Sequence, residues 1–245
     1  EKMKARLSLL GVPESVYGMR IRKCILSKEK LGESVPWYKN AYLIPEGSKS
    51  ENFVFDPISL VPCLAIDPKK GDKILDMCAA PGSKTYIMSF LSDNKANITA
   101  NDISFQRVKR LKANIHRHGV KADVLNTSGR KISGSFSKIL LDAPCSGEGM
   151  VNKHRKVLRE WSLKKIKLLA KKQKKLIKHA FNLLETNGTL VYSTCTFAPE
   201  ENEAVIDFLL SKNKNARILE PAVHNVNFIP GVTSWDGKDF DSSVA

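Results

Sequence analysis

Residues 73–91 read KILDMCAAPGSKTYIMSFL, and this stretch changes character twice. The first five residues, KILDM, form an apolar run typical of a buried strand. AAPGSK (79–84) follows with the small residues and the proline of a tight turn, and residues 85–91 are typical of the start of a helix. A strand joined to a helix through so short a turn is the first half of a βαβ unit.

The same alternation continues along the chain. Further strands are predicted where apolar runs end in polar residues, and helices where a Ser cap or an apolar stripe of helical period occurs. The predicted strands are 97–102, 122–126, 137–143, 188–194 and 216–221, and the predicted helices are 104–118, 160–185 and 200–211. Strands that alternate with helices form a parallel sheet covered on both faces. We therefore predict an α/β fold with a doubly wound, mostly parallel sheet.

The first part of the chain is less regular. Residues 2–10 predict a short helix and residues 18–26 a strand, while five prolines interrupt residues 36–68. We expect residues 1–68 to form a small N-terminal subdomain and residues 69–245 the main, catalytic domain. Doubly wound sheets commonly finish with further strands, so the final strands are either absent here or cut off.

The composition favours an intracellular protein with a polyanionic partner. The formal net charge is +15, and residues 149–180 alone hold ten Lys and two Arg against one acid, Glu160. Charge this concentrated indicates nucleic-acid contact rather than a generally basic proteome, which is the alternative explanation. The five cysteines are widely spaced without a CxxC pair, which argues against a metal site and a disulfide framework.

The sequence contains no run of 18 apolar residues and no signal-peptide cleavage pattern. We therefore expect no membrane partner and a cytoplasmic location, or a nuclear or nucleolar one if the source is eukaryotic. We also expect a monomer.

The turn after the first strand fits a nucleotide-type ligand. Ligands of open α/β sheets bind at the carboxyl ends of the strands, and Gly82 lets the backbone come close there. Asp102 ends the next strand, 20 residues after Gly82, a spacing that suits a carboxylate binding a ribose diol. Because GxGxxG is absent, we expect an adenosine compound without a phosphate cradle, and S-adenosyl-L-methionine fits that description. An ordinary strand–helix turn is the alternative.

Two cysteines lie just past predicted strands of the same sheet. Cys145 ends LLDAPC and Cys195 ends LVYSTC, with the carboxylate of Asp142 three residues before the first thiol. Both should reach one crevice, although a free cysteine is more often a small core residue. Methylation of cytosine at C5 needs a thiolate that adds to C6, an acid at N3 and a base that removes the C5 proton. Strand topology alone does not say which thiol is the nucleophile.

Four motifs in this order, ILDMCAAPGSKT, LLDAPCSGEG, LVYSTCT and PEENE, resemble those of the Nop/Sun family of RNA cytosine-C5 methyltransferases. The resemblance covers about residues 55–203. It implies a Rossmann-like class I methyltransferase fold, S-adenosyl-L-methionine as the cofactor and 5-methylcytosine in tRNA or rRNA as the product. It also implies Cys195 as the nucleophile, Cys145 as the cysteine that helps break the covalent adduct, and Asp142 as the acid at cytosine N3, close to the cofactor.

The resemblance further implies a cofactor site. Asp102 would hold the ribose hydroxyls with Arg107 nearby, and Ser128 stands where the family usually has an acid that contacts adenine. A serine hydroxyl accepts the same hydrogen bond without a charge, so we expect either weaker cofactor affinity or a neighbouring residue that takes the place of the acid. The cofactor loop would consist of Cys78, Ala79, Ala80, Pro81, Gly82, Ser83 and Lys84.

Two other functions stay open on the sequence. One is a DNA cytosine-C5 methyltransferase using Cys145, because DNA enzymes carry their nucleophile in a Pro-Cys pair. The other is a non-catalytic RNA-binding ribosome-assembly factor. For RNA contact we predict the residues that directly follow the Cys145 motif, although basic residues on a helix are often only a solvated face. These are Lys153, His154, Arg155 and Lys156.

Overall fold

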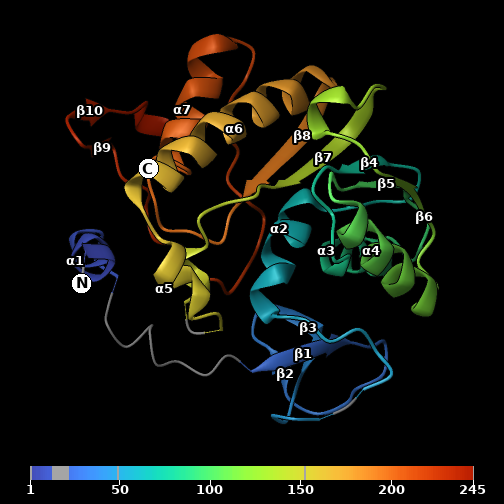
Figure 1. Ribbon diagram of the computed structural model, residues 1–245. Helices are drawn as coiled ribbons and strands as arrows, with labels where there is room; N and C mark the ends of the chain where they lie inside the picture. Colours follow the sequence, from blue (N-terminus) through green and yellow to red (C-terminus); the bar gives the residue numbers. More distant parts are fainter. Residues whose placement is uncertain (1, 13–21, 49, 152, 245) are drawn as a thin grey trace.

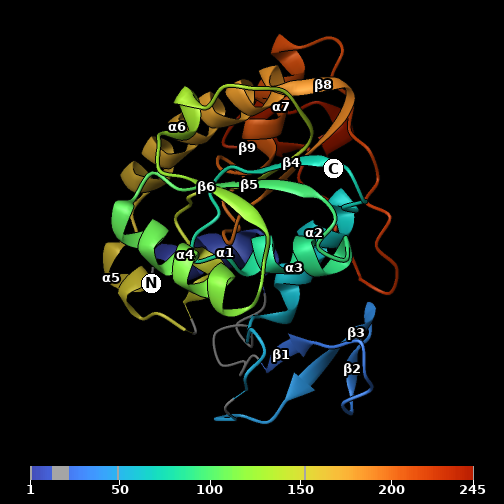
Figure 2. The same ribbon diagram turned by 90° about the vertical axis from the view of Figure 1, so that its right-hand side faces the viewer.

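The computed structural model describes residues 2–12, 22–48, 50–151 and 153–244 (Figures 1 and 2). At its centre lies a five-stranded sheet in the order β6-β5-β4-β7-β8, in which every neighbouring pair is parallel. The strands are β4 (Lys73–Asp76), β5 (Asn97–Asn101), β6 (Ala122–Leu125), β7 (Phe136–Asp142) and β8 (Leu184–Ser193). The predicted α/β fold with a doubly wound parallel sheet is confirmed.

Helices cover both faces of this sheet, because successive apolar side chains leave a strand on opposite sides. Ile74 and Leu140 pack toward α2 and α3, whereas Leu75 and Leu141 pack toward α6 and α7. Figure 2 shows α6 and α7 above the sheet and α2, α3 and α4 below it. The helices are α2 (Leu60–Ile66), α3 (Ser83–Leu91), α4 (Phe105–Arg117), α6 (Leu163–Asn182) and α7 (Glu203–Lys212).

The N-terminal part adds a small antiparallel sheet in the order β1-β3-β2, drawn at the bottom of Figure 1. Its buried side chains, among them Leu26 and Ala41, continue into the core formed by α2, α3 and the main sheet. Helix α1 packs elsewhere, with Met3 and Leu7 against Val151 beside α5 (Figure 1). The remaining elements are α1 (Lys2–Leu9), β1 (Lys23–Leu26), β2 (Ser34–Val35), β3 (Tyr38–Ile44), α5 (Lys156–Glu160), β9 (Ser234–Trp235) and β10 (Lys238–Asp239).

Several predicted elements differ from those observed. The helix predicted at 160–185 is shorter than expected. Helix α6 begins at Leu163, because Ser162 caps it by accepting a hydrogen bond from the Lys165 amide at 3.1 Å, and residues 184 and 185 already belong to β8. The strand predicted at 216–221 is wrong: Ile218 and Leu219 stay exposed, so the run buries no apolar face and pairs with no strand. Of the strand predicted at 18–26, residues 18–21 lie outside the described residues, and β1 covers the rest from Lys23. The division at residue 68 stays a prediction.

The strand order determines where a ligand can bind. From β4 the chain proceeds outward to β5 and β6, and then crosses back to β7 and β8 on the other side. The loops that follow β4 and β7 therefore diverge at the carboxyl edge of the sheet, where open α/β sheets bind their ligands. All of the motifs singled out above for chemistry follow strands at this edge.

Candidate active site

The predicted cofactor loop follows β4 directly and is fixed from two sides. The Ala79 amide donates to the Asn101 carbonyl at 2.7 Å, which ties the loop to the end of β5. Gly82 has φ of +107°, and a Cβ there would lie 2.9 Å from Leu111 Cδ1 of α4. The positive φ strongly favours glycine, and a larger residue would also have to displace the end of the Leu111 side chain. Ser83 and Lys84 begin α3 from this turn.

Asp102 lies beside this loop, at the carboxyl end of β5. Its Oδ1 accepts a hydrogen bond from the Ser104 amide at 2.9 Å, whereas its buried Oδ2 accepts none. An Arg107 nitrogen lies 3.2 Å from Oδ2, and the same guanidinium donates to the Ala80 carbonyl. A ribose hydroxyl that donated a hydrogen bond to Asp102 Oδ2 would replace this guanidinium there.

Ser128 belongs to the loop after β6, which reaches the same place. The Asn126 side chain donates to the Asp102 carbonyl at 2.8 Å, so this loop packs on the end of β5. Ser128 precedes a short 3-10 turn (Gly129–Lys131) and its hydroxyl makes no capping hydrogen bond there. A carboxylate oxygen that makes an ion pair but accepts no hydrogen bond, a glycine turn beside it and an uncharged hydroxyl together fit an adenosine-type cofactor.

Asp142 ends β7 and forms a charged pair with Lys84, the last residue of the predicted cofactor loop. Lys84 Nζ lies 2.6 Å from Asp142 Oδ2, and the Ser193 hydroxyl donates to Asp142 Oδ1 at 2.8 Å. Burial by itself would lower the pKa of Lys84, but the Asp142 carboxylate more than offsets this effect and the pKa is raised. Lys84 is therefore a positive charge at the carboxyl edge of the sheet.

The two predicted catalytic thiols touch each other. Cys145 Sγ lies 3.1 Å from Cys195 Sγ, and the Cys195 amide donates to Cys145 Sγ at 3.3 Å. The hydrogen bond from Cys145 lowers the pKa of Cys195, while the same bond and burial raise the pKa of Cys145. Cys195 is therefore the more acidic of the two thiols. Burial raises the pKa of Cys78 to about 12, so this third thiol of the region is a poor nucleophile.

Two buried carboxylates behind the thiols were missed by the sequence analysis. Glu148 is 1% exposed and accepts hydrogen bonds from Thr196, Phe197 and Trp161. Glu201 is 0% exposed and accepts from Ser146 and Gln173. Their signal was present, because Glu148 belongs to the CSGEG motif and Glu201 to PEENE. Sequence alone does not distinguish a buried glutamate from its exposed neighbours in such a motif.

The predicted RNA-binding residues do not share one environment. Lys153 is half-buried and forms an ion pair with Asp56 from the segment that leads from β3 to α2. His154, Arg155 and Lys156 are exposed, and Lys156 Nζ lies 3.1 Å from Glu160. Helix α6 adds a longer basic face, with no acid between its two ends. Its exposed lysines are Lys164, Lys167, Lys171, Lys172, Lys175 and Lys178.

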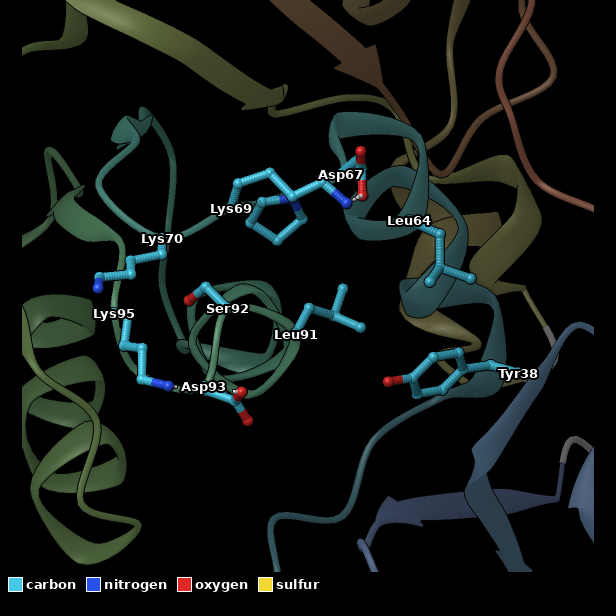
Figure 3. A pocket seen from close by; sticks show the side chains of 10 residues that line it. Tyr38, Leu64, Asp67, Lys69, Lys70, Leu91, Ser92, Asp93 and Lys95 are labelled. Atoms are coloured by element: carbon cyan, nitrogen blue, oxygen red, sulfur yellow. Dashed lines mark ion pairs between the residues drawn. The ribbon is translucent and has the colours of Figure 1, made fainter.

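A hollow on the protein surface lies away from this site. It lies between the C-terminal ends of α2 and α3, at the amino ends of β4 and β5, so it belongs to the edge of the sheet opposite the thiols (Figure 3). Lys69 lies 2.7 Å from Asp67 and Lys95 lies 3.8 Å from Asp93, so these charges are largely neutralised within the hollow. It is not a candidate for the chemistry.

Within the described part of the chain, no helix is both long and apolar enough to cross a membrane. The same residues contain no group of three or more His, Cys, Asp and Glu side chains able to hold a metal ion.

Comparison with known proteins identifies the family. Residues 63–234 match the family model described as 16S rRNA methyltransferase RsmB/F. The chain belongs to this family. It is 37% identical over 237 residues to the tRNA (cytosine(49)-C(5))-methyltransferase of Pyrococcus abyssi, which covers 91% of this chain and 76% of that protein. It is 40% identical over 190 residues to the ribosomal RNA small subunit methyltransferase F of Vibrio cholerae, which covers 70% of this chain but 40% of that protein.

Solved structures support the RsmB/F assignment. NSun6 from Pyrococcus horikoshii with SFG, an S-adenosylmethionine analogue, superposes with a TM-score of 0.60 at 37% identity, over 65% of this chain and 42% of that one. A methyltransferase homolog protein from the same organism gives a TM-score of 0.68 at 28% identity, over 80% of this chain and 72% of that one. The resemblance to the Nop/Sun family and the Rossmann-like methyltransferase fold are confirmed. The names of the family and its members indicate an RNA cytosine-C5 methyltransferase, and neither the DNA enzyme nor the non-catalytic factor is favoured.

Proposed function

We propose that this chain transfers a methyl group from S-adenosyl-L-methionine to C5 of a cytosine in tRNA or rRNA, through a covalent bond between Cys195 and C6. The observation that carries the proposal is the asymmetric thiol pair. Cys145 Sγ and Cys195 Sγ lie 3.1 Å apart, within hydrogen-bond distance, at the sheet edge where Asp142 and Lys84 also lie. A thiolate, a second thiol and a carboxylate are the groups that the reaction requires.

The cofactor would be held by the residues that surround the end of β4. Residues 78–84 would border it, Asp102 would accept from its ribose hydroxyls, and Ser128 would face its adenine. Arg107 is the group that a bound ribose would displace from Asp102. When bound, the cofactor supplies an electrophilic methyl group.

The first step belongs to Cys195. Its thiolate adds to C6 of the cytosine, which forms the C–S bond and moves an electron pair toward C5. A proton at N3 favours this addition, and Asp142 is the carboxyl group beside the thiols that can hydrogen-bond there. C5 then takes the methyl group and still carries its own hydrogen.

Release needs a base, and the thiol pair can provide one. After Cys195 bonds to C6 it is no longer an anion. The hydrogen bond to Cys195, which raises the pKa of Cys145, is then lost, and the Cys145 pKa falls. Cys145 can then give its thiol proton to solvent and, as a thiolate, take the proton from C5. The C5–H electron pair forms the C5–C6 double bond, and the C6–S bond breaks to return Cys195 as a thiolate.

The RNA would approach over the basic residues that follow the Cys145 motif. The target base has to leave its stack to reach a thiol within the crevice. Arg155, Lys156 and the exposed lysines of α6 would contact the phosphates outside the crevice. We further propose that the protein acts as a monomer in the cytoplasm.

A covalent-trapping experiment tests the proposal. Cys145→Ala is incubated with S-adenosylmethionine and either tRNA or rRNA, and protein–RNA adducts that survive denaturation are isolated and the RNA sequenced. Cys195→Ala and a cytosine-containing DNA duplex are the controls. We expect an adduct from Cys145→Ala with one of the two RNAs and none from Cys195→Ala. Methylation retained by Cys195→Ala would overturn the assignment of the nucleophile.

A further inference from the structure

Two segments bring the thiols together, and each contributes one buried glutamate. The Cys145 loop comprises residues 143–150 and contains Glu148, while the Cys195 loop comprises residues 194–202 and contains Glu201. We propose that Glu148 and Glu201 are positioning residues, in which each carboxylate binds the opposite loop and the two together set the spacing of the thiols. This proposal rests on the function proposed above, because it concerns how the same two thiols are held.

Glu148 reaches from the Cys145 loop to the Cys195 loop. Its Oε2 accepts hydrogen bonds from the Thr196 hydroxyl at 3.0 Å and from the Phe197 amide at 3.2 Å. Its Oε1 accepts from Trp161 Nε1 at 2.7 Å. Because Thr196 gives its hydroxyl proton to Glu148, the Ser146 hydroxyl at 2.7 Å must donate to Thr196. The residues that follow both cysteines therefore form one hydrogen-bonded chain that ends on Glu148.

Glu201 reaches in the opposite direction. Its carboxylate accepts from the Ser146 amide at 3.0 Å, the peptide directly after Cys145. Gln173 of α6 donates to the same carboxylate at 2.7 Å and to the Pro144 carbonyl at 2.9 Å. Helix α6 is thereby joined to both loops through one buried side chain.

The backbone completes this arrangement. The Gly149 amide donates to the Cys195 carbonyl at 2.9 Å, and the Tyr192 hydroxyl donates to the Glu201 carbonyl at 2.6 Å. Carboxylates suit this role because they are acceptors only and can bind several donors at once. The charge of Glu201 also helps, after the bond to Cys195 and burial, to keep the Cys145 pKa high.

Substitution by glutamine tests the hydrogen-bonding role of each carboxylate separately from the size of its side chain. A glutamine at either position keeps the size of the side chain but has one acceptor oxygen and two N–H donors. At position 148 three donors would then meet one acceptor, so at least one donor would lose its partner. Glu203→Gln is the matched control, because Glu203 belongs to the same PEENE motif but accepts from the Val232 amide at 3.2 Å.

The spacing of the thiols can be measured without RNA. Phenylarsine oxide binds two neighbouring thiols at once, so its affinity reports whether Cys145 and Cys195 stay together, and Cys145→Ala gives the single-thiol baseline. Iodoacetamide alkylation of the Cys195 peptide against pH, followed by mass spectrometry, reports the thiolate. We expect Glu148→Gln and Glu201→Gln to bind the arsenical about tenfold more weakly and to alkylate at a higher pH midpoint, while Glu203→Gln matches the wild type.

A second substitution keeps the proposal testable if a glutamine variant does not fold. Thr196→Val removes the hydroxyl between Ser146 and Glu148, and Thr196→Ser restores it. We expect Thr196→Val to weaken arsenical binding and Thr196→Ser to recover it. Wild-type affinity and alkylation midpoint in the folded Glu→Gln and Thr196→Val variants would overturn the proposal. Because neither assay contains RNA, this result is separate from a failure of the methyltransferase assignment in the trapping experiment.

Discussion

The hydrogen bond between the thiols predicts how far Cys145 activates Cys195. Cys145→Ala removes the donor, and a hydrogen bond to a charged group contributes about 1.5–3 kcal/mol. Since Cys195 is exposed, water replaces part of this bond, and the lower end, about 1.5 kcal/mol, applies. One pKa unit corresponds to about 1.4 kcal/mol, so we expect the Cys195 pKa to rise by about one unit.

Cys145→Ser separates activation from release. A serine hydroxyl still donates to the Cys195 thiolate, but an alcohol is far too weak an acid to become the base that takes the C5 proton. We therefore expect Cys145→Ser to keep Cys195 reactive and to accumulate the RNA adduct. Cys145→Ala should also accumulate the adduct, but about tenfold more slowly at pH values below the Cys195 pKa, because less of Cys195 is then a thiolate.

The assay is the rate of iodoacetamide alkylation of Cys195 between pH 5 and pH 10, read by mass spectrometry of the Cys195 peptide. We expect the midpoint to move up by about one unit in Cys145→Ala and to move much less in Cys145→Ser. An unchanged midpoint in Cys145→Ala would show that the thiol contact does not activate Cys195. Equal midpoints in the two variants, both shifted, would show that the hydroxyl does not replace the thiol as donor.

Three further predictions address stability, geometry and RNA contact. Burial raises the pKa of Asp76 from 3.8 to about 7, so its contribution to stability is complete below pH 3.8 and is lost as pH rises toward 7. Asp76→Asn should match the wild type at pH 4 and be more stable by about 4 kcal/mol at pH 8, measured by urea unfolding. Gly149→Ala would place a Cβ 3.1 Å from the Cys195 carbonyl, so we expect the turnover rate to fall about tenfold with the fold retained in circular dichroism. Lys164→Ala with Lys167→Ala should weaken RNA binding and lower the salt slope of log Kd by about 2, in a filter-binding titration.

The central sheet could be predicted from the sequence because its signals are local. β4 and β7 are runs of apolar residues buried on both faces. Ser104 caps α4, because its hydroxyl oxygen accepts a hydrogen bond from the Arg107 amide at 3.4 Å. The order of strands and helices then brought the loops after β4, β7 and β8 to one edge. That was enough to place the predicted cofactor loop, Asp142 and both cysteines in one region.

The rest depends on contacts between distant residues. Lys153 was predicted to face RNA, but it pairs with Asp56, which lies 97 positions earlier. The glutamates behind the thiols are buried only because the Cys145 and Cys195 loops, about 50 residues apart, pack on each other. Helix α2 was missed because Pro62 interrupts a short apolar segment, which is helical only where it packs on α3 and the sheet. Tertiary packing decides such features, and local propensity does not.

The proposed division of labour between the thiols has the same non-local origin. Both cysteines follow apolar strands at one sheet edge, and Cys145 and Cys195 would have similar pKa values as isolated thiols. What separates them is burial of Cys145 together with its hydrogen bond to the more exposed Cys195. The asymmetry therefore depends on how the two loops pack on each other, and the glutamates that join the loops affect which thiol carries the proton. A change at Glu148 or Glu201 should consequently alter the chemistry of Cys195 without touching it, as the alkylation profiles of these variants will test.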